Sequence, residues 1–354
     1  MTDAYVALES GEVLEARARS PGRARGELVF TTAYTGYEES LTDPSYAEQV
    51  LTFSYPLIGN YGVRGERFES DRVQPNAVLA RELTDDVAAW LDGEGVPAVD
   101  RLDTRDVVTG VREEGAMDCG IAAGEDATPE AARAELDDCV GMSEHVDIGS
   151  QVSVSETRVH RGGGRYDVAL IDCGAKGSIA SSLCDRGADV HQLPYDATPA
   201  DVRSVEPDLL FLSNGPGDPE NFTDARTLVD ELVGEVPIAG ICLGQQIVAG
   251  ALGGSTEKMA FGHRGVNQPV MDLDSGRVVM TTQNHGYTVA KPGDLDVTQR
   301  NVNDDTPEGL ASEDLGVLTR QYHPEANPGP HDSFDFFEDV LAMADAQCVA
   351  AVAD

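Results

Sequence analysis

The sequence predicts an α/β protein in which a smaller mixed α+β domain precedes a C-terminal domain with a mostly parallel sheet flanked by helices. After residue 166, short apolar segments alternate with helical patterns, which is typical of βαβ units. The length of 354 residues suits two domains, and the polar stretch 141–165 contains three consecutive glycines near its end. We therefore expect domains at 1–145 and 166–354, joined by a linker at 146–165.

The N-terminal domain is expected to begin with a β-hairpin. Apolar residues alternate over residues 4–17 on both sides of Ser10 and Gly11, which together form a turn signal. Strand patterns follow at 27–32 and 49–54, and a helical pattern at 85–93. These segments predict a mixed domain without determining its topology.

The C-terminal domain has the more regular pattern. Its first strands are expected at 167–174, 188–195, 208–214 and 237–242. The helices that follow them are expected at 176–186, 198–205, 224–233 and 243–252. Later strands at 277–282, 296–300 and 316–321 should extend the sheet before a helix at 334–344. Because ligands of open sheets bind at the carboxyl ends of strands, we expect the chemistry at 213–219, 240–246 and just after residue 321.

The charge balance excludes some partners. With 63 acidic and 25 basic residues, the net charge of -38 would repel nucleic-acid phosphates and anionic membranes, so neither is an expected partner. Only three lysines occur, and we interpret the composition as adaptation to a salt-rich cytoplasm, where ions screen self-repulsion. The first residues lack a signal peptide's apolar segment, and no apolar run approaches the roughly 18 residues of a membrane-spanning helix. A cytoplasmic protein is expected.

One of the six cysteines is a candidate nucleophile. The chain has no CxxC pair, so neither disulfides nor a metal site is expected. Cys242 lies in Gly240-Ile241-Cys242-Leu243-Gly244, at the end of an expected strand. Glycines two residues either side of a nucleophile permit a sharp strand-to-helix turn, and the helix N-terminus favours a thiolate. The amide of Leu243 would then point toward a developing oxyanion. The alternative is a small buried cysteine in a tight turn.

A thiol nucleophile needs a base, and His323 is the candidate among seven histidines. It follows the strand that ends near residue 321, and Glu325 could hold its second ring nitrogen. Pro324 between them restricts the local backbone. The tripeptide His323-Pro324-Glu325 alone can occur by chance, but it is a stronger indication of a catalytic site when it follows the Cys242 motif in the chain.

The third strand end bears Ser213-Asn214-Gly215-Pro216-Gly217-Asp218-Pro219. Two glycines around a proline expose backbone amides at close range, which suits a carbonyl or an oxyanion. Taken alone, the segment is better interpreted as an ordinary Gly-Pro turn.

Together these segments carry a specific resemblance. GICLGQQ (240–246), SNGPGDP (213–219) and YHPEA (322–326) resemble the three motif blocks of class I glutamine amidotransferase domains. The resemblance implies glutamine hydrolysis, with attack by Cys242 on the side-chain amide, His323 as base and acid, and Glu325 orienting the histidine. It also implies that Leu243 and Gly217 provide the oxyanion amides. Residues 28–63 resemble the N-terminal domain of carbamoyl-phosphate synthetase small subunits. Further segments similar to that family are 103–105, 171–176, 261–269 and 283–287.

The resemblance also implies a set of substrate contacts. Carried over by position, the residues that bind L-glutamine are Ser45, Gly215, Gly217, Leu243, Gln246, Asn284, Gly286 and Tyr287. Because Ser45 belongs to the N-terminal domain, the substrate would lie against the domain interface. His263 and His285 lie in family-like segments and are given structural or interface roles. One position departs from the family, which commonly has histidine where this chain has Gln245.

The resemblance further implies a partner. Residues 174–178 lack the spacing of a phosphate-binding loop, so no ATP site is expected here and no cofactor is expected in this subunit. A large carbamoyl-phosphate synthetase subunit would use ATP and magnesium and receive ammonia through a tunnel. Its product would serve arginine and pyrimidine biosynthesis.

Three other functions stay open. A class I amidotransferase could serve another synthase, although such enzymes normally need no counterpart of residues 1–145. A regulatory subunit could keep the fold without the chemistry, which the presence of Cys242, His323 and Glu325 disfavours. A cysteine hydrolase or peptidase on the same fold would differ in its substrate.

Overall fold

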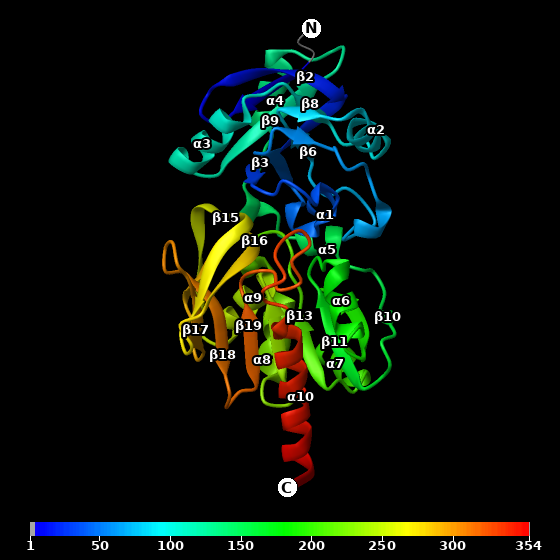
Figure 1. The fold of residues 1–354 in the computed structure, drawn as a ribbon, viewed down its shortest axis with the longest axis vertical. Coiled ribbons are helices and arrows are strands. Elements are labelled where there is room, and N and C mark those ends of the chain that lie inside the picture. The colour runs from blue at the N-terminus through cyan, green and yellow to red at the C-terminus, as the bar shows by residue number, and fades with distance from the viewer. Residues whose placement is uncertain (1–3, 354) are drawn as a thin grey trace. The chain divides into compact units, whose positions relative to one another are not determined.

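The computed structural model describes residues 4–353, and of 347–353 only the backbone. The chain forms two compact units (Figure 1). The N-terminal unit comprises residues 1–145 and 260–265, and the C-terminal unit comprises 146–259 and 266–354. The short segment 260–265 thus belongs with the N-terminal unit despite its distance along the chain. Among the described residues, no helix is long and apolar enough to span a membrane.

The N-terminal unit contains a closed barrel with the strand order β1-β2-β8-β6-β4-β3-β9. Its strands are β1 (Ala4–Leu8), β2 (Val13–Ser20), β3 (Gly22–Thr31), β4 (Gln49–Phe53), β6 (Ala77–Leu79), β8 (Ala98–Asp100) and β9 (Met117–Ala123). The other elements are α1 (Tyr37–Thr42), η1 (Pro44–Tyr46), β5 (Leu57–Ile58), η2 (Gly65–Arg67), β7 (Glu82–Leu83), α2 (Asp85–Gly93), α3 (Thr104–Glu114), α4 (Pro129–Asp137) and η3 (Met142–Glu144). The expected hairpin and the expected helix at 85–93 are both confirmed.

Closure of the barrel depends on β9. This strand pairs antiparallel with both β1 and β3, so that Val6 lies opposite Ile121. Val6, Ile121, Leu28 and Val50 contribute fully buried side chains to one apolar cluster. Such pairings join segments far apart in sequence, and therefore no local pattern could have predicted them.

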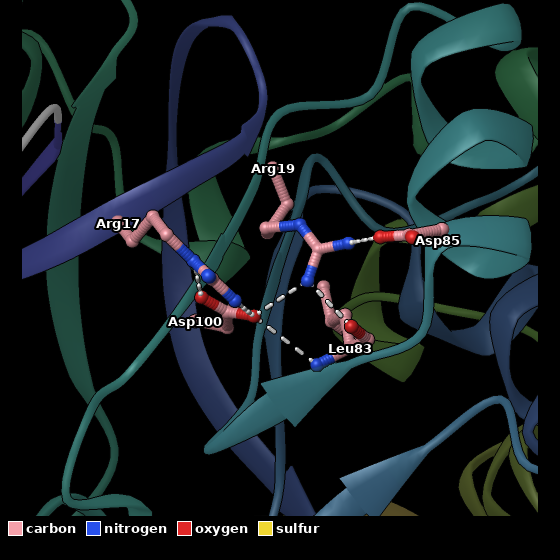
Figure 2. A network of polar contacts seen from close by, with 5 residues as sticks. All are labelled: Arg17, Arg19, Leu83, Asp85 and Asp100. Atoms are coloured by element: carbon pink, nitrogen blue, oxygen red, sulfur yellow. Dashed lines mark hydrogen bonds and ion pairs between the residues drawn. The ribbon is translucent and has the colours of Figure 1, made fainter.

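A buried carboxylate fastens β2 to β8 (Figure 2). Asp100 is fully buried and accepts two hydrogen bonds from Arg17 at 2.7 Å and one from Arg19 at 2.9 Å. Burial raises the pKa of Asp100, but the hydrogen bonds from the two arginines and from the Leu83 amide outweigh burial and lower it. Arg19 also donates to Asp85, at the start of α2. The charges of Arg17 and Arg19 are thus matched by carboxylates.

The C-terminal unit is built on a ten-stranded sheet with the order β10-β12-β11-β13-β14-β19-β18-β17-β15-β16. The strands are β10 (Arg158–His160), β11 (Tyr166–Asp172), β12 (Ala188–Pro194), β13 (Leu209–Leu212), β14 (Ile238–Ile241), β15 (Ser255–Asp272), β16 (Val278–Lys291), β17 (Asp296–Asn301), β18 (Pro307–Ser312) and β19 (Val317–Arg320). The helical elements are α5 (Ile148–Val152), α6 (Gly177–Cys184), α7 (Pro199–Ser204), η4 (Pro219–Asn221), α8 (Thr223–Leu232), α9 (Leu243–Ala251) and α10 (Asp335–Ala353).

The sheet is parallel only in its central part. Strands β12, β11, β13, β14 and β19 run parallel, whereas β10, β17 and β18 pair antiparallel with their neighbours. The prediction of a mostly parallel sheet is corrected to this extent. Short turns separate β17, β18 and β19, whereas a parallel connection needs a crossover of roughly a dozen residues or more, so these strands can only pair antiparallel.

The expected linker 146–165 contains α5 and β10, and β10 pairs with β12. The domain boundaries themselves stay a prediction.

Helices α6 and α10 pack against the central strands. Phe336 and Phe337 of α10 contact Phe211 of β13, with ring centroids 6.3 and 6.4 Å away. Ile179 and Leu183 of α6 belong to the same buried cluster. This layer holds the central strands together and fixes where their carboxyl ends lie.

Candidate active site

Three predicted segments meet at one edge of the sheet. Strand β14 lies between β13 and β19, and all three run parallel. In their register Leu212 is opposite Gly240, and Ile241 is opposite Arg320. Residues 213–219, Cys242 and the segment from 321 onward therefore follow the carboxyl ends of adjacent strands. The three segments thus lie where the sequence predicts them, at the carboxyl ends of neighbouring parallel strands, and the chemistry assigned to them stays a prediction.

Cys242 occupies the sharp turn between β14 and α9. Its φ of 55° and ψ of -106° fall outside the conformations that L-residues ordinarily adopt. A Cβ on Gly240 would lie 2.8 Å from the Gly244 carbonyl carbon, and one on Gly244 would lie 2.3 Å from the Leu212 oxygen. The Cys242 amide donates to the Arg320 carbonyl at 2.8 Å. The glycines are thus needed for the turn, as their spacing predicts.

His323 and Glu325 form a buried pair. Nδ1 of His323 lies 2.6 Å from Oε1 of Glu325, and the His323 amide donates to the Thr282 carbonyl at 2.9 Å. Burial lowers the pKa of His323, but the Glu325 charge and contacts with Cys242 and Glu325 outweigh burial and raise it to about 10. The ring therefore holds a proton at neutral pH. An imidazolium is the partner with which thiolate nucleophiles are paired.

Lys176 completes this buried charge group, and the sequence analysis did not assign it a role. Its Nζ lies 3.1 Å from Oε1 of Glu325 and donates to the Ala326 carbonyl at 2.6 Å. Burial raises the pKa of Glu325, but the charges of Lys176 and His323 outweigh burial and lower it to about 2. One signal could have revealed Lys176, because it is one of three lysines and follows a central strand that ends at the same sheet edge.

Replacing Lys176 by methionine should destabilise the C-terminal unit. The substitution leaves Glu325 buried with one cationic partner instead of two, and breaking a buried pair costs about 3–5 kcal/mol. Urea unfolding would measure the free energy of unfolding, with Lys291→Met as the control because Lys291 is exposed on the same unit. If both variants unfold at the same urea concentration, Lys176 does not stabilise the pair.

Several predicted substrate-binding residues lie beside these groups. Gln246 donates to the Tyr287 carbonyl at 2.8 Å and to the Gln321 side chain at 3.2 Å. The Cys242 sulfur lies 3.8 Å from the Asn284 carbonyl oxygen. Strand β16 thus runs along the nucleophile and contributes Asn284, Gly286 and Tyr287.

The two glycines after β13 are closely enclosed. A Cβ on Gly215 would lie 2.0 Å from the Cys173 carbonyl oxygen and 2.9 Å from the Leu243 side chain. Gly217 has a φ of 92°, and a Cβ there would lie 2.8 Å from Ile148. Only glycine fits either position without displacing these neighbours.

Three further residues are given roles by resemblance: Ser45 as a substrate contact, and His263 and His285 as structural or interface residues. Ser45 lies in η1 of the N-terminal unit, where its amide donates to Asp43 at 2.9 Å, so its contact with a substrate stays a prediction. Both ring nitrogens of His285 are hydrogen-bonded, to the Tyr287 carbonyl and to Gln283. His263 belongs to the segment 260–265 of the N-terminal unit. Their structural roles also stay predictions.

Gln245 occupies the position where the resembling family commonly has histidine. It is fully buried, and its side-chain oxygen accepts a hydrogen bond from the Thr319 hydroxyl at 3.1 Å. Gln245 is therefore hydrogen-bonded to β19 and not to His323 or Glu325.

The arrangement suits covalent catalysis by a cysteine. Cys242 can attack an electrophilic carbon, His323 can supply a proton to a leaving group, and Glu325 can hold the ring in position. The first amides of α9 have no intrahelical acceptor, because the first four N–H groups of a helix never do. They begin at Leu243 and can stabilise a tetrahedral oxyanion.

Two known protein families match different parts of this chain. Residues 6–121 match the family described as carbamoyl-phosphate synthase small chain, CPSase domain, and residues 169–343 match glutamine amidotransferase class-I. The chain is 72% identical to the carbamoyl phosphate synthase small chain of Halobacterium salinarum, over 100% of both chains. It is 40% identical to that of Archaeoglobus fulgidus, covering 96% of this chain and 98% of the relative. The solved structure of a glutamine amidotransferase from Thermotoga maritima is 16% identical, with a TM-score of 0.38 over 47% of this chain and 77% of that one.

Proposed function

Since the chain belongs to the carbamoyl-phosphate synthase small-chain family and contains a class I glutamine amidotransferase domain, we propose that Cys242, His323 and Glu325 hydrolyse L-glutamine. The observation that carries this proposal is the strained Cys242 on one strand end beside the buried His323–Glu325 pair on the next. The products are glutamate and ammonia.

The reaction proceeds through a thioester. The Cys242 thiolate attacks the side-chain amide carbon of glutamine, and the amides of Leu243 and Gly217 stabilise the resulting oxyanion. Protonated His323 gives its proton to the leaving nitrogen, so ammonia departs and a γ-glutamyl thioester remains. Neutral His323 then accepts a proton from water, which attacks the thioester and releases glutamate. The thiolate and the imidazolium are restored, and one water is consumed.

The high pKa of His323 suits the first step. With a pKa raised to about 10, the ring holds the required proton before attack begins. Lys176 and His323 keep Glu325 ionised, so the orienting carboxylate stays charged throughout. Together these features keep the ring of His323 protonated and oriented before attack.

The proposed domains are 1–145 and 166–354, with 146–165 between them, and each is assigned substrate contacts by resemblance to the family. Gly215, Gly217, Leu243, Gln246, Asn284, Gly286 and Tyr287 contact L-glutamine from the second domain. Ser45 contributes from the first.

Replacing Ser45 by alanine should raise the KM for glutamine about three- to tenfold, with a smaller effect on kcat. The reason is that one hydrogen bond to the bound substrate is worth about 0.5–1.5 kcal/mol. Steady-state kinetics of glutamate release would measure both constants. Ser20→Ala serves as the control, since Ser20 is also a buried serine of the N-terminal unit. An unchanged KM in Ser45→Ala would place the serine away from the substrate.

The ammonia passes to a large synthetase chain, which uses ATP and magnesium to make carbamoyl phosphate for arginine and pyrimidine biosynthesis. This chain itself needs no cofactor or metal, and the complex works in the cytoplasm. What supports the partner is the small-chain family together with a motif set that contains no phosphate-binding loop.

A glutaminase assay distinguishes this proposal from the other candidate functions. The purified chain, with and without a large chain, would be given glutamine, asparagine and a glutamine-containing peptide. We expect release of glutamate and ammonia from glutamine alone, stimulated by the large chain. No hydrolysis in either condition would favour a purely regulatory role, and cleavage of the peptide would favour a peptidase.

A further inference from the structure

The arginines of the N-terminal unit fall into two groups. Arg17 and Arg19 are matched by Asp100 and Asp85 (Figure 2). Within residues 4–353, by contrast, Arg81, Arg105 and Arg112 have no ion pair and no side-chain hydrogen bond. In a chain with 63 acidic residues against 25 basic ones, three such arginines in one place are unexpected.

These three arginines line one cavity. It has a volume of about 410 Å³, and three hydroxyl residues, Ser54, Thr104 and Thr109, also line it. Its lining includes no carboxylate. Small-molecule sites typically occupy about 300–1,000 Å³. The cavity therefore has the size of a small-ligand site and offers only donors or neutral groups.

Helix α3 provides five of the eight residues that line the cavity. Arg105, Thr109 and Arg112 follow one another at i, i+4 and i+7, so they share a face of the helix. The opposite stripe, with Val107 and Val111, is buried in the barrel cluster. Packing of that stripe fixes which way the arginine face points.

The carboxylates nearest in sequence do not neutralise the cavity. Glu82, Asp106 and Glu113 adjoin the arginines along the chain, but none of them lines it. Glu82 and Asp103 line a neighbouring cavity of about 470 Å³, where Arg81 also lies. The Asp103 side chain accepts a hydrogen bond from the Arg105 amide. The 410 Å³ cavity is therefore lined by three arginines and by no carboxylate, and Arg81 is shared with the neighbouring cavity.

We propose that this cavity binds a small anion bearing a phosphate group. A guanidinium presents paired donors that match two phosphate oxygens, and a dianion can engage several guanidiniums and hydroxyls at once. A chloride ion lacks that geometry, so a phosphate group keeps an advantage even where salt screens simple attraction. Cys242, His323 and Glu325 lie in the other unit, and Ser45 does not line this cavity, so the site takes no part in glutamine hydrolysis.

Inorganic phosphate, a phosphate monoester and a nucleotide share the chemistry that the cavity recognises. Isothermal titration calorimetry of the full chain, folded in molar KCl and a phosphate-free buffer, would compare inorganic phosphate, ribose 5-phosphate and ATP, with adenosine as the uncharged control. The order of the three affinities identifies the source of the phosphate group. The same titrations are made with Arg105→Gln, Arg112→Gln and Arg133→Gln. Arg133 is the matched control, an exposed arginine on another helix of the same unit.

We expect at least one phosphate-bearing probe to bind once per chain. Both Arg105→Gln and Arg112→Gln should weaken it by about tenfold or more, since each removes a charge-assisted contact, and Arg133→Gln should bind normally. The proposal is overturned if no probe binds, or if the Arg133→Gln variant loses as much affinity as the others. It is also overturned if Arg105→Gln and Arg112→Gln bind the phosphate-bearing probes normally and instead bind a large chain more weakly. The arginines would then contact a protein partner. Glutaminase activity is measured separately, so either proposal can fail alone.

Discussion

Replacing Cys242 by serine should lower glutamine hydrolysis by at least about a thousandfold, because a hydroxyl is a far weaker nucleophile than a thiolate and removing a nucleophile typically removes most of the catalysis. The side chains are similar in size, so the turn between β14 and α9 should keep its shape. His323→Asn should have a comparable effect, since no group then protonates the leaving nitrogen. Glutamate release from glutamine, measured at saturating substrate, gives the decrease directly.

The assembled synthetase supplies the control for this result. Carbamoyl phosphate made from free ammonia should be unchanged in Cys242→Ser, because ammonia bypasses the small chain. Cys173→Ser is the matched substitution, since Cys173 is also buried in the C-terminal unit and burial raises the pKa of its thiol. Equal loss of glutamine-dependent and ammonia-dependent synthesis would mean that Cys242 has a structural role.

Lowering the salt concentration below about 0.1 M should loosen or unfold the isolated chain, and molar KCl should restore it. Repulsion among carboxylates reaches about 30 Å in dilute buffer and about 3 Å near 1 M salt. Surface pairs such as Arg203–Glu235, with both side chains about half exposed, add little to stability because solvent screens them. With 63 acidic residues against 25 basic ones, screening removes more repulsion than attraction. Native stability of about 5–15 kcal/mol is small enough for this difference to decide folding.

Thermal unfolding across a series of KCl concentrations checks the prediction. The melting temperature should rise with salt most steeply at low concentration, where the Debye length changes most. Sucrose is the control, because it stabilises folded proteins by being excluded from their surface and adds no ions. A rise in melting temperature with KCl that sucrose does not reproduce is due to charge screening. A melting temperature that stays flat or falls as KCl rises would leave the acidic composition without this explanation.

The sequence predicts the central strands well because they are local features. Each of the segments 167–174, 208–214 and 237–242 is an apolar run followed by a helical pattern, and most of β11 and all of β13 and β14 lie within them. The structural reason for Gly240 and Gly244 could likewise be inferred, since a sharp turn at a nucleophile excludes larger side chains.

The features that sequence analysis missed depend on contacts across the chain. The barrel closes through β9, which pairs with β1 and β3 far away along the chain, and these pairings have no local signal. Lys176 was missed for the same reason, because its partner Glu325 is 149 residues away and only the parallel register of the sheet brings them together. The roles given to the substrate-binding residues came from resemblance and stay proposals.

The segment 260–265 has a consequence for synthesis of the chain on the ribosome. It belongs to the N-terminal unit, and the Ala116 amide donates to its Ala260 carbonyl at 2.6 Å. Residue 265 is translated 120 residues after residue 145, which takes about 6–24 s at about 5–20 residues per second. During that interval the nascent N-terminal unit lacks one of its own segments. The N-terminal unit is therefore complete only once more than half of the second unit has been translated, although the barrel strands themselves all lie within residues 4–123. The usual order in which each domain finishes before the next does not hold here.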